Sequence, residues 1–352
     1  MQLKQNHPAC DVFTHEDLFE PAKKPLSRLF TVASVVCAHK VRKSPEKLFC
    51  VLNMCTALMD ATPTLRKVLY STSISTDVGG LLAELKETAR GIIKELKGLI
   101  QTYSSQKVVQ NEGITSLTGY LMRYIRLLVK HKSSLDTVLG HDHTDTVSIV
   151  EELKSTGHHG LLTVEGMNST GSLVFELIAD LDSVLEKQSK LFSSKDLQCI
   201  FLMNNMHFIL QEVDQSDIRL IVGSRWIRKC QNRINAYMND YLSASWGPVR
   251  SNLETAKSIS PSKRLRTNIL NFLSASPPPL QNFIWSFSGT CDVQMCWRVP
   301  SPVLRDVLRE KILEFVAPAY HAHLESLKRS VRGTAEDFEL ELKSKISELF
   351  EG

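Results

Sequence analysis

Apolar residues recur at every third or fourth position along most of the chain, which is the spacing of one buried helix face. Gly and Pro number only 16 and 13 among 352 residues, so helix breakers are sparse. No two neighbouring segments alternate apolar and polar residues as paired strands would. The apolar stripes cover residues 48–59, 78–104, 116–135, 171–192, 197–213, 303–316 and 338–349. We therefore expect an all-α protein.

Polar residues that precede a proline or an acid mark where helices begin, and prolines inside the pattern mark where they end or bend. Short connections make sequential helices antiparallel neighbours. We expect an elongated rod of stacked antiparallel helical bundles over residues 26–352, after a loosely ordered lead-in at residues 1–25. The expected starts are Ser44, Ser193, Ser301 and Thr334, with an end at Trp246–Pro248 and a kink at Pro318.

Two asparagines, Asn204 and Asn205, stand in the middle of an otherwise apolar helix. Asparagine is a poor residue for a helix interior. A buried amide that bonds to a neighbouring helix and fixes its register explains the pair better than a ligand site does.

Composition describes an ordinary globular protein, 43% hydrophobic and 23% charged. None of the eight cysteines forms a CxxC pair, which favours reduced thiols in a cytosolic protein. The N-terminus lacks the apolar core of a secretory signal. The longest apolar run, Leu29–Ala38, is about half as long as a bilayer span. Any membrane contact should therefore be peripheral.

Motifs that hold nucleotides or activate nucleophiles, such as GxxxxGK[ST], HExxH and GxSxG, do not occur. We therefore expect neither an enzyme nor a cofactor. One polar loop is rich in metal-ligand types, but its spacing fits no closed tetrahedral site, so no metal is predicted. Its residues are His141, Asp142, His143 and Asp145, with His158 and His159 beyond them.

Basic clusters recur on an otherwise mild net charge of +4, which does not favour nucleic acid. The clusters lie at 219–233, at 257–266, and at Lys328, Arg329 and Arg332. A charge run is commonly a solvated face. The alternative is a surface for anionic lipid, where each basic side chain contributes about 1 kcal/mol.

Several stretches occur in the order found in one known family. A FLMNN helix at residues 201–205 is followed by WIRK at 226–229 and WGPV at 246–249. Three longer segments agree as well, namely KSPEKLFCVLNM (43–54), SLTGYLMRYIRLL (116–128) and WRVPSPVLRDVLREKILEFVAPAY (297–320). Over roughly residues 27–352 the chain resembles the seventy-kilodalton subunit of the exocyst, the complex that tethers secretory vesicles to the plasma membrane, in its plant form.

The resemblance implies a rod of stacked helical bundles without enzyme activity. It implies contacts with other exocyst subunits and with a Rho-type GTPase. It also implies peripheral binding to phosphatidylinositol 4,5-bisphosphate through basic residues near the C-terminus. The corresponding location is the cytoplasm, at the plasma membrane and secretory vesicles.

The family has a Lys-Tyr-Ile-Lys-Tyr-Thr segment before its last helix, where this chain has RSVRGT. Arg329 and Arg332 fall on the two lysines, and Lys328 adds to the local field. Arginine suits phosphate at least as well as lysine. Both tyrosines are lost, to Ser330 and Gly333. The resemblance therefore implies a lipid site at Lys328, Arg329 and Arg332 without its interfacial aromatics.

Two departures support a different function. Residues 335–352 hold six acids against two lysines, a local charge of −4 that opposes an anionic membrane. The chain also begins well inside the family's length, so we expect the N-terminal helices of the coiled-coil assembly to be absent. The alternative is a divergent interaction scaffold without a tethering role, such as a partner or target of pathogen effectors, with weakened lipid binding.

Overall fold

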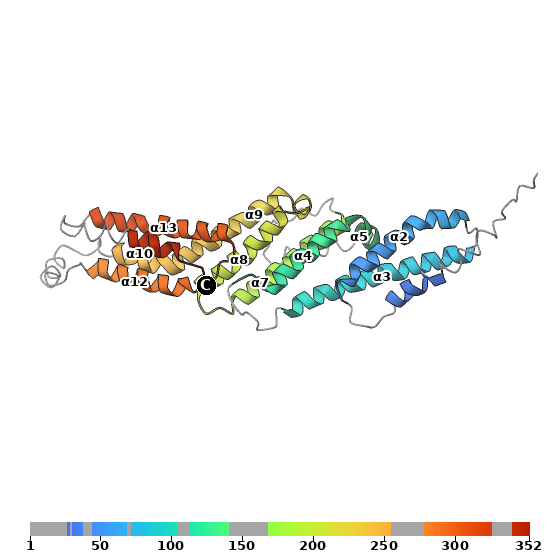
Figure 1. Ribbon diagram of the computed structural model, residues 1–352, viewed down its shortest axis with the longest axis horizontal. Coiled ribbons are helices and arrows are strands. Elements are labelled where there is room, and N and C mark those ends of the chain that lie inside the picture. The colour runs from blue at the N-terminus through green and yellow to red at the C-terminus, as the bar shows by residue number, and fades with distance from the viewer. Residues whose placement is uncertain are drawn as a thin grey trace, which may run out of the picture. The chain divides into compact units, whose positions relative to one another are not determined.

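The computed structural model describes residues 27–28, 30–37, 44–68, 72–103, 113–140, 168–254, 278–325 and 340–352 (Figure 1). Every regular element in these ranges is a helix, and the one β-bridge there joins Arg298 to Glu351. The expected all-α class is therefore confirmed. The helices are α2 (Lys47–Val68), α3 (Thr72–Tyr103), α4 (Ser116–Lys130), α5 (Lys132–Leu139), α7 (Ser169–Ser189), α8 (Lys195–Asp214), α9 (Ile218–Tyr241), η1 (Leu242–Trp246), α10 (Gly247–Glu254), α12 (Pro278–Met295) and α13 (Pro302–Glu325).

The chain divides into two compact units, each assembled from segments that are separate in the sequence. Unit 1 comprises Met1–Leu99, Leu127–His158 and Val164–Val174. Unit 2 comprises Ile100–Arg126, His159–Thr163 and Phe175–Gly352. The boundary expected at residue 25 lies outside the described residues and stays a prediction.

In unit 1, α5 is hydrogen-bonded to both α2 and α3. The hydroxyls of Thr56 on α2 and Ser134 on α5 lie 2.6 Å apart. Arg90 on α3 donates from Nη2 to the carbonyl of Val138, 3.1 Å away. The apolar stripe expected for α3 is the buried face, as Leu85, Ala89, Ile92 and Leu96 show.

The sequence predicted one helix over 116–135, and this was wrong. The structure has two helices, α4 and α5, separated by a turn at His131. The His131 amide is shared between the carbonyls of Leu127 and Leu128, and its Nδ1 lies 3.0 Å from the Leu127 oxygen. The ring also contacts Phe49, with centroids 5.2 Å apart. These contacts hold the turn, and the apolar period did not reveal it.

The start of α2 also differs from the prediction. The helix begins at Lys47, after a turn at Pro45 and Glu46. The Ser44 hydroxyl donates to the Glu46 carboxylate instead of capping the helix, while the Ser44 carbonyl accepts the amide of Lys47.

One described stretch, Lys47–Leu65 in α2, is long and apolar enough to cross a membrane by length and composition. Core helices meet the same criteria. Here Leu48, Val51, Leu52 and Cys55 are fully buried within unit 1. These four residues form the buried face of α2.

In unit 2, α8 packs along α9, which continues through η1 into α10 (Figure 1). The helix end expected at Trp246–Pro248 was wrong. Pro248 lacks an amide hydrogen, and its ring would clash with the preceding turn of a regular helix. The turn widens into the π-helix η1, where the Gly247 amide bonds to the Leu242 carbonyl, and the chain then continues as α10.

Gly223 interrupts α9 with φ 71° and ψ 168°, a conformation that favours glycine. A Cβ there would meet no atom within 4 Å. The backbone angles, rather than crowding, therefore account for glycine at this position. The residues before Gly223 form a short helical turn, and the long part of α9 follows.

The C-terminal bundle comprises α10, α12, α13 and residues 340–352. Its core is aromatic: the Phe283 ring lies 5.6 Å from Tyr320, and Phe287 lies 5.6 Å from Trp246. The predicted inner face of the last helix is confirmed at Leu342, Ile346 and Leu349. The predicted helix start at Thr334 lies outside the described residues.

The other predicted helix starts had different outcomes. The start at Ser301 is confirmed, because its Oγ accepts the amide of Leu304 at 3.4 Å. The cap of α8 lies at Ser194, not Ser193, and makes no side-chain bond. Helix α13 continues through Pro318 to Glu325.

Candidate functional site

The predicted lipid-binding residues Lys328, Arg329 and Arg332 lie outside the described residues. The described chain adjoins them on both sides, at the end of α13 and at Leu340. Helix α13 and the segment from Leu340 both belong to the C-terminal bundle.

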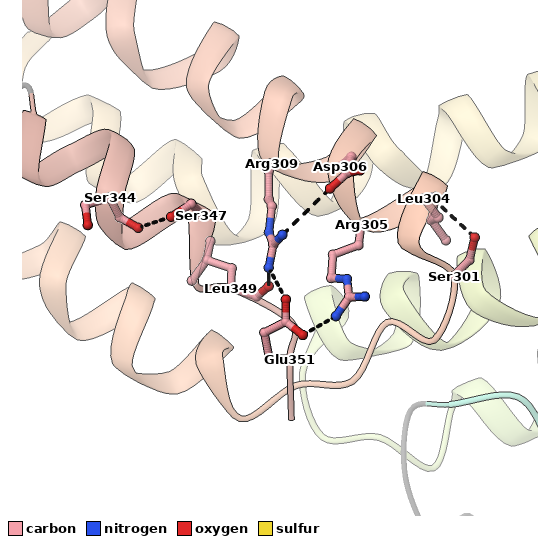
Figure 2. Close-up of polar contacts among 9 residues, drawn as sticks. All are labelled: Ser301, Leu304, Arg305, Asp306, Arg309, Ser344, Ser347, Leu349 and Glu351. Atoms are coloured by element: carbon pink, nitrogen blue, oxygen red, sulfur yellow. Dashed lines mark hydrogen bonds and ion pairs between the residues drawn. The ribbon is translucent and has the colours of Figure 1, made fainter.

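The last four residues are held against α13 in what we call the C-terminal latch, formed by Leu349–Gly352 with Arg305 and Arg309. Figure 2 shows both arginines directed at Glu351, to which each is ion-paired. Arg309 donates from Nη2 to Glu351 Oε1 at 2.8 Å and to the Leu349 carbonyl at 2.6 Å. Their i, i+4 spacing places the two arginines on one face of α13.

Backbone bonds and burial complete the latch. The Phe350 amide donates to the Gln294 carbonyl at 3.2 Å, and its own carbonyl accepts the Val299 amide at 3.3 Å. Phe350 is fully buried and adopts a left-handed φ of 66°. Its ring lies 6.3 Å from Tyr241. Burial of this side chain makes the strained backbone conformation tolerable.

The latch changes the electrostatics of the chain end. The hydrogen bond from Arg309 and the charges of both arginines hold the pKa of Glu351 below its usual range. Glu341 lies 3.8 Å from Lys345. Two of the acids that seemed to oppose an anionic membrane are thus paired with cations.

A buried polar network lies beneath the latch. Tyr241 donates to the side-chain oxygen of Gln294 at 2.6 Å and accepts the indole N–H of Trp246 at 2.8 Å. Gln294 donates to Ser245 at 3.0 Å, and Ser245 donates to Asp196 at 2.8 Å. Burial raises the pKa of Tyr241, which therefore remains a neutral donor. The network joins α8, α9, η1 and α12, so its chemistry is structural.

The prediction for the two asparagines is supported. Asn205 accepts the Thr115 amide at 2.9 Å and the Thr118 hydroxyl at 2.8 Å through Oδ1. Its Nδ2 donates to the carbonyls of Gly113 and Phe201. Asn204 donates to the Arg298 carbonyl at 2.9 Å. The pair ties α8 to the start of α4 and to the segment before α13.

The basic cluster at 219–233 does not form one uniform surface. Arg233 is half-buried and bonds Asp182 on α7 through two nitrogens, at 2.5 and 3.0 Å. Burial opposes its charge, but the bonds and charge of Asp182 prevail, so the pKa of Arg233 is raised. Arg225 and Arg228 are exposed and available to a partner.

Two arginines on α4 differ in their surroundings: Arg126 pairs with Glu212 on α8 at 2.5 Å, whereas Arg123 is exposed. The cluster at 257–266 lies outside the described residues, as do the histidines and aspartates of the metal-ligand loop. Within the ranges given for the structure, no three His, Cys, Asp or Glu side chains gather as a metal site requires.

The seven described cysteines are free thiols. Burial raises the pKa of Cys230 and of Cys291 to about 12. These thiols are therefore protonated and unreactive at neutral pH. Cys50 and Cys296 are exposed.

Sequence reasoning missed the latch. The helical spacing of Arg305 and Arg309 was visible, but the acid that they bind lies 46 positions from Arg305. No local sequence pattern therefore connects the two arginines to Glu351.

Comparison with known proteins agrees with the helical fold. A family model that describes the C-terminal region of the Exo70 subunit of the exocyst complex matches residues 6–344. Exocyst complex component EXO70B2 of Arabidopsis thaliana is 27% identical over 289 residues, covering 81% of this chain and 43% of the relative. EXO70B1 of the same plant is 27% identical over 323 residues, covering 88% and 47%. The chain spans about half the length of the curated relatives that it matches.

Solved structures are similar in fold. A structure of S. cerevisiae Exo70 matches with a TM-score of 0.62 at 15% identity, covering 98% of this chain and 66% of that one. A second Exo70p structure, described together with Exo84p C-terminal domains, gives 0.61 at 14% identity, covering 97% and 66%. Because the family model matches nearly the whole length, the chain belongs to the family defined by the C-terminal region of the Exo70 exocyst protein.

Proposed function

We propose that the chain acts in an exocyst subunit that tethers secretory vesicles, by docking at phosphatidylinositol 4,5-bisphosphate in the plasma membrane. Lys328, Arg329 and Arg332 contact the lipid phosphates, with the arginines as bidentate donors. The chain works as a binding element and not as an enzyme. The observation that carries the proposal is membership of a family of exocyst complex subunits.

The electrostatics of the C-terminal bundle support this role. Glu351 is paired with Arg305 and Arg309, which lie outside the acidic segment, so this acid repels an anionic surface less than the segment's charge of −4 implied. Pairing of an acid with nearby cations lowers the repulsion that it adds to an anionic surface.

The proposal includes partners and location. The chain contacts other exocyst subunits and a Rho-type GTPase, and it works in the cytoplasm, at the plasma membrane and secretory vesicles. The family description supports the first of these partners most directly, because it names one member of a multi-protein complex.

Charge reversal tests the site. We expect Arg329→Glu with Arg332→Glu to weaken binding to phosphoinositide vesicles more than about tenfold, since each basic contact contributes about 1 kcal/mol and reversal adds repulsion. Co-sedimentation with phosphatidylcholine vesicles, with and without phosphatidylinositol 4,5-bisphosphate, gives the affinity. Arg225→Glu with Arg228→Glu is the matched control, because it removes the same charge from an exposed part of α9.

The outcomes separate the hypotheses. Loss of binding in the first variant alone supports the assignment. Loss in the α9 control alone moves the membrane surface to α9 and overturns the assignment. Absence of phosphoinositide-dependent binding in the unmodified chain overturns the proposed function and favours the interaction scaffold.

A further inference from the structure

The exposed apolar side chains of the C-terminal bundle include a tryptophan. Trp285 on α12 is 74% exposed, whereas the other tryptophans, Trp226, Trp246 and Trp297, are at most 8% exposed. A large aromatic ring left in water is unfavourable by the same apolar burial that stabilises cores. Its exposure therefore calls for a partner.

Leu340, which is 71% exposed, begins the described part of the last helix. This helix runs parallel to α12: Lys345 bonds Ser288 at 3.2 Å, and Phe350 bonds the Gln294 carbonyl farther along both segments. Trp285 lies one helical turn before Ser288, and Leu340 lies just over one turn before Lys345. The two apolar side chains thus occupy the same level of the bundle.

Helix α12, which carries Trp285, is almost without charge. Asp292 is the one charged residue in its sequence, PPLQNFIWSFSGTCDVQM. Glu341, next to Leu340, is paired with Lys345. An amphipathic ring with a polar tip, on a face of weak net charge, suits the boundary between lipid headgroups and acyl chains.

The size of the patch favours a membrane over a protein. The two side chains expose on the order of 300 Å², well below the roughly 800 Å² that each partner buries in a standard protein interface. Leu340 also follows the proposed phosphate-binding residues closely in the sequence. Apolar insertion beside basic contacts is the combination that gives stable peripheral binding.

We propose that Trp285 and Leu340 insert together into the interface of an anionic bilayer, as an apolar anchor beside the phosphoinositide contacts. The proposal rests on the proposed function. The anchor supplies an interfacial aromatic from α12, where the basic segment itself has Ser330 and Gly333.

The tryptophans provide the test. We expect vesicles of phosphatidylcholine with phosphatidylinositol 4,5-bisphosphate to shift the tryptophan fluorescence of the full chain to shorter wavelength. The same vesicles should protect this fluorescence from quenching by iodide. Because the other three tryptophans are buried, both changes report Trp285. Trp285→Phe should abolish the spectral shift while retaining most of the vesicle affinity, because phenylalanine keeps the apolar ring.

Affinity variants add an independent readout. Trp285→Ala should weaken vesicle binding about tenfold, and Leu340→Ala should weaken it less, in proportion to the apolar area lost. Val303→Ala is the matched control: Val303 is 62% exposed, but it lies in the first turn of α13, close to the latch-bound Arg305. It should leave the affinity unchanged.

Vesicle binding and tryptophan fluorescence together distinguish a failure of the anchor from a failure of the proposed function. Phosphoinositide-dependent binding with unchanged emission and unchanged Trp285→Ala affinity overturns the anchor and leaves the function standing. An emission shift with phosphatidylcholine alone supports the anchor but counts against phosphoinositide dependence. If no vesicle shifts the emission but another exocyst protein does, Trp285 faces a protein and the anchor is overturned.

Discussion

At the scale of single residues, buried polar side chains fix which helices meet. Asn205 is fully buried and satisfied by four bonds, to Thr115, Thr118, Gly113 and Phe201. A buried donor or acceptor that loses its partner costs about 1–3 kcal/mol. The bonds of Asn205 to Gly113, Thr115 and Thr118 therefore select one register of α8 against the start of α4.

We expect Asn205→Leu to lower the free energy of unfolding by about 2–4 kcal/mol, because the replacement keeps the bulk but strands the Thr115 amide and the Thr118 hydroxyl. Urea denaturation followed by circular dichroism measures the change. Asn235→Leu, on the exposed face of α9, is the matched control and should stay within about 0.5 kcal/mol of the unmodified chain. Equal stability of the two variants would contradict the register role.

At the scale of elements, the apolar period predicts the buried faces of the described helices, whereas contacts between segments decide where the helices end. The stripes of α3 and the last helix were predictable because one side of each must be buried, whereas α8 is buried on all sides between Cys199 and Met206. The turn at His131 and the π-helix η1 were not predictable, since one depends on a ring packed across the unit and the other on how a helix accommodates Pro248. The latch was hidden for a similar reason, because it joins α13 to the chain end.

We expect Glu351→Gln to loosen the latch without unfolding the bundle, because it removes the charge that binds Arg305 and Arg309 but spares the buried Phe350. Hydrogen exchange, expressed as protection of the Val299 and Phe350 amides, is the measurement. Protection in the unmodified chain should be full above the ordinary pKa of a glutamate and fall as pH drops through the lowered pKa of Glu351.

The Glu351→Gln variant should show no such fall, since its side chain does not titrate. Glu348→Gln is the control on the same segment: its carboxylate is exposed and makes no ion pair among the described residues. The role of the latch charge would be refuted by identical pH profiles in all three proteins.

At the scale of the whole molecule, family and fold class followed from the sequence, whereas the lipid site stays a prediction. The FLMNN, WIRK and WGPV segments carried the family resemblance, and each places a buried aromatic in unit 2, namely Phe201, Trp226 and Trp246. The proposed lipid-binding residues lie outside the described residues, and their assignment stays a prediction that rests on two arginines without the neighbouring aromatics. The exposed Trp285 carried no sequence signal, since its position on α12 fits an apolar stripe equally well.

Co-sedimentation of the unmodified chain with vesicles at physiological salt shows whether the chain docks on phosphoinositide. Phosphatidylcholine vesicles with and without phosphatidylinositol 4,5-bisphosphate form the comparison. We predict binding that requires the phosphoinositide and weakens as salt rises, because Lys328, Arg329 and Arg332 act through charge. Equal recovery with and without the phosphoinositide would contradict the account and leave the basic segment as a solvated surface.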